Sequence, residues 1–138
     1  MKKVFVDTLY WLAIVRPKDP WQTSAKRARS LIGNVFMVST DEVLTEFLNA
    51  LSPGGEHMRK QAVQMVKQIL ANPNVKVIPQ SRDSFLKGLE LYEQRADKAY
   101  SLTDCISMNV MAKESITEVL TNDKHFEQEG YVVIIKHK

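Results

Sequence analysis

The sequence holds one cysteine, Cys105, in 138 residues. A lone thiol cannot form an internal disulfide, which excludes a disulfide-stabilised secreted scaffold. No apolar run approaches the roughly 18 to 20 residues of a membrane-spanning helix. The N-terminal segment VFVDTLYWLAIV is interrupted by Asp7 and lacks a small-residue cleavage site, so it does not fit a signal peptide. Five glycines and five prolines are scattered, without repeats or low-complexity tracts. We expect one soluble, cytoplasmic domain covering residues 1–138, with no membrane partner.

An excess of one charge is also lacking. Lys and Arg number 19 against 16 Asp and Glu, which gives a formal net charge of +3. This balance favours a polyanionic partner only mildly. Hydrophobic residues make up 44% of the chain, and a domain of this length can bury roughly two-thirds of its unfolded surface. Collagen, coiled-coil and disordered classes are excluded, and an ordinary globular core is expected.

Short apolar segments alternate with helical patterns along the chain. Helices are expected between the strands, the last of them a short turn over 123–129. Strands separated by helices indicate a parallel sheet with helices on both faces. We therefore predict a three-layer α/β/α domain around a mainly parallel sheet of about five strands. The expected strands cover residues 3–6, 36–38, 75–78, 118–120 and 131–135.

Two of the expected helices carry specific local predictions. Ser39 and Glu42 have the spacing of a capping box, which would start the helix after the second strand. Further along, Phe85, Leu89 and Tyr92 recur at helical spacing and are expected to form a buried face.

Four carboxylates fall at or beside the carboxyl ends of the expected strands. Asp7 follows the first strand and Asp123 follows the fourth. Asp104 opens the buried helix over 103–113, and Glu46 lies one turn into the helix after the second strand. In open α/β sheets, ligands bind beyond the carboxyl ends of the strands, where the strand order reverses. We expect the four side chains to converge at this edge.

Each acid also has a purely structural explanation. Asp7 can cap a turn, and Asp123 can be the N-cap of the following helical turn. Asp104 can close a capping box with Ser101, although it also points along an apolar stripe, where a carboxylate must be paired, hydrogen-bonded or metal-bound. Glu46 lies at a seam between core and solvent, where solvated glutamates are common. The case for a site depends on the set of four.

Converging carboxylates raise one another's pKa values, so a cation is the usual compensation. An all-oxygen set without a cysteine or histidine cluster suits Mg²⁺ or Mn²⁺ rather than Zn²⁺. Metal-assisted attack of water on a phosphodiester is the reaction that fits best. Cys105 is expected to be a core thiol. His125, two residues after Asp123, can approach the site, but an exposed helix histidine is the simpler expectation.

Four segments are distinctive when taken together: VFVDT, TEFLNAL, DKAYSLTDCIS and LTNDKHF. They resemble the PIN domain family, in particular the VapC-type toxin ribonucleases of bacterial toxin–antitoxin modules, and the resemblance covers essentially the whole chain. It implies a PIN-like fold and a metal-dependent endoribonuclease that hydrolyses RNA phosphodiester bonds. It further implies Mg²⁺ or Mn²⁺ as cofactor, homodimerisation and inhibition by a cognate antitoxin protein.

The resemblance also assigns roles to residues. The family's acidic quartet falls on Asp7, Glu46, Asp104 and Asp123. On this reading Asp7, Asp104 and Asp123 hold the metal directly or through water. Glu46 binds the metal or orients the attacking water.

The residues around the quartet receive weaker assignments. The hydroxyl residues Thr103 and Thr121 belong to the family's site, with Thr103 expected to fix a carboxylate by a hydrogen bond. Tyr100 stands where many relatives have tryptophan. Candidates for guiding RNA are the basic side chains Lys98, Lys26, Arg27, Arg29, Arg59 and Lys60. Apolar positions that belong either to a dimer surface or to the core are Trp11, Trp21, Met58, Met65 and Tyr92.

Other functions remain open at this stage. A PIN-fold nuclease in RNA processing, with no antitoxin, would carry the same residues. A catalytically silent module that binds RNA or a protein partner is a third reading, although it has no need to hold four acids together. A phosphatase of small phosphomonoesters is a more distant alternative.

Overall fold

The computed structural model describes residues 1–137. Their strands form one parallel sheet with the order β3-β2-β1-β4-β5. The predicted parallel sheet of about five strands is confirmed. The strands are β1 (Lys2–Val6), β2 (Val35–Thr40), β3 (Val75–Ile78), β4 (Glu118–Leu120) and β5 (Val132–Val133).

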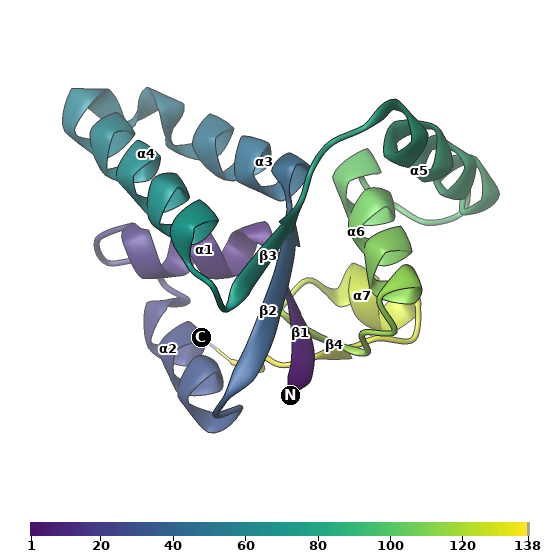
Figure 1. Cartoon of the computed structure of the whole chain (residues 1–138), viewed down its shortest axis with the longest axis horizontal. Helices are drawn as coiled ribbons and strands as arrows, with labels where there is room; N and C mark the ends of the chain where they lie inside the picture. The colour runs from purple at the N-terminus through teal and green to yellow at the C-terminus, as the bar shows by residue number, and fades with distance from the viewer. Residues whose placement is uncertain (138) are drawn as a thin grey trace.

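Helices cover both faces of this sheet. Figure 1 shows α1 to α4 on one side of the strands and α5, α6 and α7 on the other, which confirms the three-layer prediction. Within residues 1–137, no helix is both long enough and apolar enough to cross a membrane. The helices are α1 (Thr8–Val15), α2 (Gln22–Leu31), α3 (Asp41–Leu51), α4 (Gly55–Ala71), α5 (Arg82–Gln94), α6 (Leu102–Lys113) and α7 (Lys124–Gln128), with a 3₁₀ turn at Ser52–Gly54.

The central strand β1 marks the point where the strand order reverses. From β1 the chain adds β2 and β3 on one side and later returns to add β4 and β5 on the other. At the carboxyl end of the β1–β4 pair, Val6 lies opposite Leu120. The crevice beyond these two strand ends is where an open α/β sheet binds its ligand.

The sheet is buried on both faces, which explains its continuous apolar strands. Val4, Phe5 and Val6 of β1 have no exposed surface, and Val38 of β2 is equally buried. Cys105 on α6 also lies in this core, as predicted.

The start of α3 differs from the sequence prediction. Thr40 is the N-cap residue, and its side chain accepts a 3.0 Å hydrogen bond from the backbone N–H of Val43. Ser39 is still in β2, where its hydroxyl donates to the carbonyl of Val6 at 2.9 Å. The capping box predicted for Ser39 and Glu42 is therefore wrong, because the strand continues two residues further than expected, to Thr40.

The face of α5 predicted to be buried is exposed. Phe85, Leu89 and Tyr92 keep 40%, 46% and 50% of their surface accessible. The helix instead turns Gly88 toward α6, so closely that a Cβ at this position would lie 2.5 Å from Cγ1 of Ile106. The close contact between α5 and α6 is possible because Gly88 has no side chain. Phe85, Leu89 and Tyr92 consequently lie on the outer side of α5.

The other apolar positions singled out from the sequence divide between core and periphery. Trp11 is 4% exposed and belongs to the core. Trp21, Met58 and Met65 are partly buried and pack against it. Homodimerisation remains a prediction.

We expect Gly88→Ala to destabilise the fold, although alanine normally stabilises a helix interior by about 1 kcal/mol relative to glycine. The new Cβ overlaps Ile106, and overpacking of this kind costs about 1–3 kcal/mol. Urea unfolding of the two proteins measures the difference. In an Ile106→Ala background, which removes the clashing atom, Gly88→Ala should lose its destabilising effect. A stabilising effect in the wild-type background would contradict the close contact of α5 and α6.

Candidate active site

The four predicted carboxylates meet at the carboxyl end of the sheet. Asp7 directly follows β1, Glu46 lies on α3, Asp104 is in the first turn of α6, and Asp123 is the residue before α7. All four line one cleft of about 690 Å³, referred to below as the cleft. The structure therefore brings together the residues that the sequence placed at separate strand ends.

Asp7 is the most buried of the four, with 6% of its surface accessible. Its Oδ2 accepts a hydrogen bond of 2.9 Å from the hydroxyl of Thr121. Burial raises the pKa of Asp7 from 3.8 to about 7, and the nearby negative charges of Asp104 and Glu46 act in the same direction. Hydrogen bonds from Thr121 and the Thr8 backbone offset this only in part.

Glu46 is held by a residue that sequence reasoning missed. The hydroxyl of Thr8, in the first turn of α1, donates to Oε1 of Glu46. Thr8 immediately follows Asp7, so one short segment supplies an acid to the cleft and fixes a second acid from another helix. Its position next to Asp7 at a helix start was the available signal.

Asp104 and Asp123 serve as helix caps and as cleft residues at the same time. Asp104 and Ser101 form the capping box of α6, with backbone-to-side-chain bonds of 3.1 and 3.0 Å. Oδ1 of Asp123 accepts from the backbone N–H of His125 at 2.9 Å. Among the described residues, the second oxygen of each carboxylate receives no hydrogen bond. The structural explanations are correct, yet each cap leaves one oxygen for a ligand.

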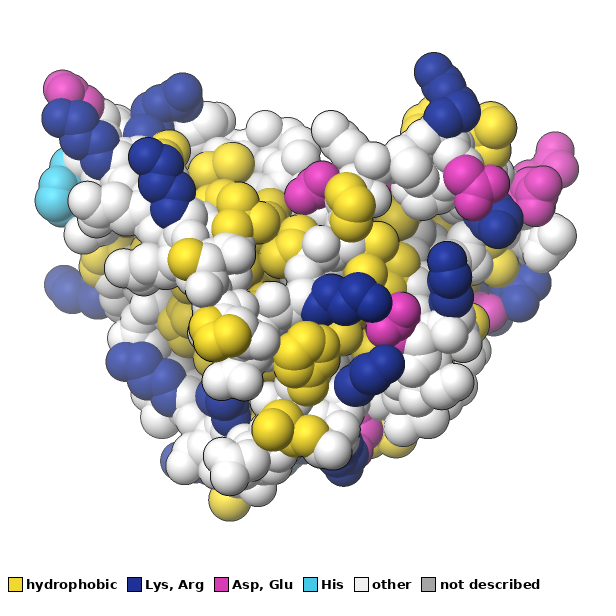
Figure 2. All heavy atoms as spheres, viewed as in Figure 1, with side chains coloured by type: hydrophobic (Ala, Val, Ile, Leu, Met, Phe, Trp, Pro, Cys, Tyr) yellow, Lys and Arg dark blue, Asp and Glu magenta, His cyan; other side chains and the backbone are white. Residues whose placement is uncertain are grey.

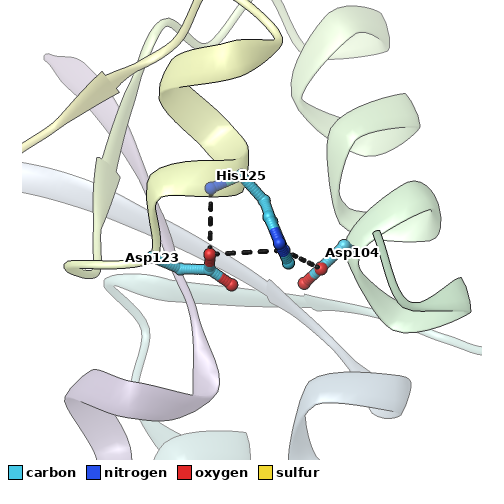
Figure 3. A group of neighbouring side chains, drawn as sticks. All are labelled: Asp104, Asp123 and His125. Atoms are coloured by element: carbon cyan, nitrogen blue, oxygen red, sulfur yellow. Dashed lines mark hydrogen bonds and ion pairs between the residues drawn. The ribbon is translucent and has the colours of Figure 1, made fainter. Parts of the chain in front are cut away.

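His125 belongs to the cleft, and the expectation of an exposed helix histidine is wrong. Its Nδ1 lies 3.0 Å from Oδ2 of Asp104 and 3.3 Å from Oδ1 of Asp123. Figure 3 shows the imidazole turned back from α7 toward both acids. The cap at Asp123 sets the direction of α7 and brings this ring over the acids. Ligand atoms of these three residues lie within 4.8 Å of one another.

A second group of side chains supports His125 from behind. The ring of Tyr100 packs against the imidazole, with centroids 5.4 Å apart. The Tyr100 hydroxyl donates to Oε1 of Glu129 at 3.0 Å, and Arg95 binds both carboxylate oxygens of Glu129 at 3.0 and 2.8 Å. Arg95 lowers the pKa of Glu129 accordingly. From the sequence, only Tyr100 attracted notice, as a replacement for tryptophan.

The two predicted hydroxyl residues differ in their surroundings. Thr121 is fully buried, donates to Asp7 and accepts from the backbone N–H of Asp123 at 3.2 Å, so it ties two acids together. Thr103 lies beside Glu46 in a smaller hollow of about 250 Å³. Within residues 1–137 its hydroxyl makes no hydrogen bond to the four acids, and its supporting role remains a prediction.

The basic residues proposed to guide RNA do not form one patch. Lys26, Arg27, Arg59 and Lys60 are exposed, whereas the half-buried Arg29 donates to the carbonyl of Gly33. On the face in Figure 2, Lys and Arg side chains are spread over several regions. Lys98 lines a different hollow from the acids. The arginine that does line the cleft is Arg16, which sequence reasoning missed.

A divalent cation fits the cleft chemically. The donors are carboxylate oxygens with one imidazole nitrogen, and a buried carboxylate is unfavourable without a counter-charge. Within residues 1–137, no Lys or Arg forms an ion pair with any of the four acids, and His125 is the one basic side chain that contacts them. The negative charge of the cleft is thus left for a bound cation to offset.

Comparisons with known proteins agree with this fold. A model of the PIN domain family matches residues 4–129, which confirms the resemblance seen in the sequence. No curated protein matches the chain. Among solved structures, VapC20 of Mycobacterium tuberculosis, described as a sarcin–ricin loop cleaving toxin, has a TM-score of 0.81 at 25% identity. That match covers 94% of this chain and 96% of VapC20.

Two further structures share the fold at lower identity. FitAcB from Neisseria gonorrhoeae has a TM-score of 0.65 at 14% identity, covering 95% of this chain and 96% of its own. A toxin–antitoxin complex from Klebsiella pneumoniae has a TM-score of 0.62 at 13% identity, covering 88% and 87%.

We expect metal-free Asp7→Asn to become more stable than the wild type as the pH rises. A raised folded-state pKa contributes stability below about pH 3.8 that is lost as the pH rises through about 7. The asparagine side chain does not ionise, so the variant does not lose this stability. Its free energy of unfolding should therefore rise relative to that of the wild type by roughly 2–3 kcal/mol between pH 5 and pH 8. Urea unfolding in EDTA at several pH values measures it. The exposed control Asp97→Asn should follow the wild type, and a pH-independent gap for Asp7→Asn would contradict the raised pKa.

Proposed function

The chain belongs to the PIN domain family, and from that premise we propose that it is a divalent-metal-dependent endoribonuclease, the toxin of a toxin–antitoxin pair. The observation that carries the proposal is the convergence of four carboxylates, with no Lys or Arg paired to them in the described residues, at the switch point of the sheet. The similarity to VapC20, which spans nearly all of both chains, supports RNA as the substrate class.

The proposed chemistry assigns each acid a task. Asp7, Asp104 and Asp123 would hold the cation directly or through water, since all three line the cleft and, among the described residues, Asp104 and Asp123 each keep one carboxylate oxygen without a hydrogen bond. A bound Mg²⁺ or Mn²⁺ would supply Lewis-acid stabilisation of the charge that develops on the phosphate. Thr8 fixes one carboxylate oxygen of Glu46 and leaves the other free. The free oxygen can accept a hydrogen bond from the attacking water and so orient it.

Partners follow from the same premise. We propose a cognate antitoxin protein that inhibits the enzyme and a homodimeric state, in line with the family resemblance. The Klebsiella structure with the same fold was solved as a toxin–antitoxin complex. An RNA-processing nuclease without an antitoxin would use the same cleft, and inhibition by a co-encoded protein separates the two functions. A silent binding module is disfavoured, because binding alone gives no reason to desolvate Asp7.

The test is cleavage of a mixed RNA pool by the purified protein in Mg²⁺ or Mn²⁺, with EDTA as control. Asp104→Asn should reduce the rate by more than about 100-fold, since even partners outside a coordination shell contribute about 10- to 100-fold. The exposed control Asp97→Asn should cleave like the wild type. Cleavage that persists in EDTA, or in a folded Asp104→Asn variant, would refute the metal-dependent mechanism.

His125 gives the proposal a second test that needs no RNA. Imidazole nitrogen is a softer ligand than carboxylate oxygen and is accepted more readily by Mn²⁺ than by Mg²⁺. If His125 contributes a ligand atom, His125→Ala should weaken Mn²⁺ binding by a larger factor than Mg²⁺ binding, as measured by calorimetric titration. Equal weakening of both metals would show instead that the ring only orients Asp104 and Asp123.

A further inference from the structure

The cleft extends well beyond the four acids. Its wall continues along α1 and over the connection to α2, where it is formed by Leu9, Leu12, Pro20 and Trp21, with Arg16 and Asp19 also in the lining. Binding to an RNA backbone needs cations and hydrogen-bond donors. An apolar wall with one aromatic ring, continuous with the carboxylates, has no role in such backbone binding.

We propose that this wall is a base-binding subsite, which takes one unpaired nucleobase next to the phosphate that is cleaved. The inference rests on the proposed function and adds to it a residue, Trp21, that positions the RNA next to the carboxylates. The base stacks on the indole of Trp21 and contacts Leu9 and Leu12, while Arg16 binds an adjacent phosphate. Stacking on aromatic side chains is the common way in which proteins bind single-stranded bases.

The backbone around Trp21 is fixed before any ligand binds. Its N–H donates to Oδ1 of Asp19 at 2.8 Å. The side chain of Gln22 donates to the carbonyl groups of Ala13 and Arg16 at 3.0 and 3.2 Å, which ties the start of α2 to the end of α1. The backbone that carries the ring is therefore held relative to α1, and less backbone freedom is lost on binding.

The charges at the rim suit an anionic ligand. The guanidinium of Arg16 is 3.9 Å from Oδ2 of Asp19, a long ion pair, and its side chain is 42% exposed. A phosphate entering the cleft can approach this guanidinium from the solvent side. Arg16 thus offers a positive charge in the lining of a cleft whose four carboxylates repel the RNA backbone in the absence of a cation.

The size of the cleft supports a nucleotide rather than a cation alone. About 690 Å³ falls in the range of pockets for small organic ligands, roughly 300–1,000 Å³. A base inside an A-form helix is stacked and paired, so it cannot reach the wall without leaving the helix. An unpaired base next to the cleaved phosphate is therefore the ligand that this wall can take.

The experiment uses an RNA oligonucleotide with one mapped cleavage position and single abasic substitutions on either side of it. Trp21→Ala should lower kcat/KM by roughly 5- to 150-fold, the equivalent of one stacked base at about 1–3 kcal/mol. Trp21→Phe should restore most of the activity, because a ring is retained. Tyr92→Ala, which removes an exposed aromatic side chain outside the cleft, should cleave like the wild type.

The abasic series provides the decisive comparison. At one position the missing base should slow the wild type by a factor similar to that of Trp21→Ala, and it should slow the Trp21→Ala enzyme no further. The inference is overturned if a folded Trp21→Ala variant keeps full kcat/KM, or if every abasic penalty is the same in both proteins.

A binding measurement keeps this inference distinct from the proposed function. Trp11 is buried in the core, so quenching of tryptophan fluorescence by adenosine monophosphate in Mg²⁺ reports mainly on Trp21. Quenching of the wild type but not of Trp21→Phe, with no effect of inorganic phosphate, supports the subsite. Equal quenching of both proteins overturns it. Failure of the wild type to cleave any RNA refutes the nuclease function, and the fluorescence result then stands alone.

Discussion

The desolvated carboxylate of Asp7 is the constraint around which the cleft is arranged. It lies at the carboxyl end of the central strand β1. The sheet order reverses here, with β2 and β3 on one side of β1 and β4 and β5 on the other. Burial and two acidic neighbours raise its pKa to about 7. A group of this kind opposes folding when it is ionised, and the protein retains it together with Thr121, which holds it in place. Such an arrangement is expected where a cation, and not the protein alone, completes the charge balance.

Helix ends supply the rest of the geometry. Asp104 and Asp123 are caps of α6 and α7, so their carboxylates are fixed by the same hydrogen bonds that begin the helices. Thr121 links Asp7 to the backbone of Asp123, and Thr8 links the start of α1 to Glu46. The hydrogen bonds that define the helix starts therefore also determine where the acids lie. A change in a helix start would move a carboxylate.

Much of this was predictable from the sequence, for physical reasons. Strands buried on both faces are continuous apolar runs, and acids placed after them must share an edge if the sheet is parallel, which located Asp7 and Asp123. Features that depend on contacts between distant segments were not predictable. The contact of His125 with Asp104 and the orientation of α5, with Gly88 facing α6, follow from packing between helices. Arg16 was not singled out from the sequence, and Trp21 was singled out only as a core or dimer-surface position, because their place in the cleft depends on how α1 and α2 are joined.

The shortest helix of the site illustrates how a weak surface interaction acquires importance. α7 has five residues, too few to be stable as an isolated helix. It is held by the Asp123 cap, by the buried ring of Phe126 and, at its far end, by the pair of Arg95 and Glu129. A half-exposed ion pair contributes little to the free energy of unfolding. This one nevertheless ties the far end of α7 to the segment that follows α5. We therefore expect its loss to shift Asp123 and His125 rather than to unfold the domain.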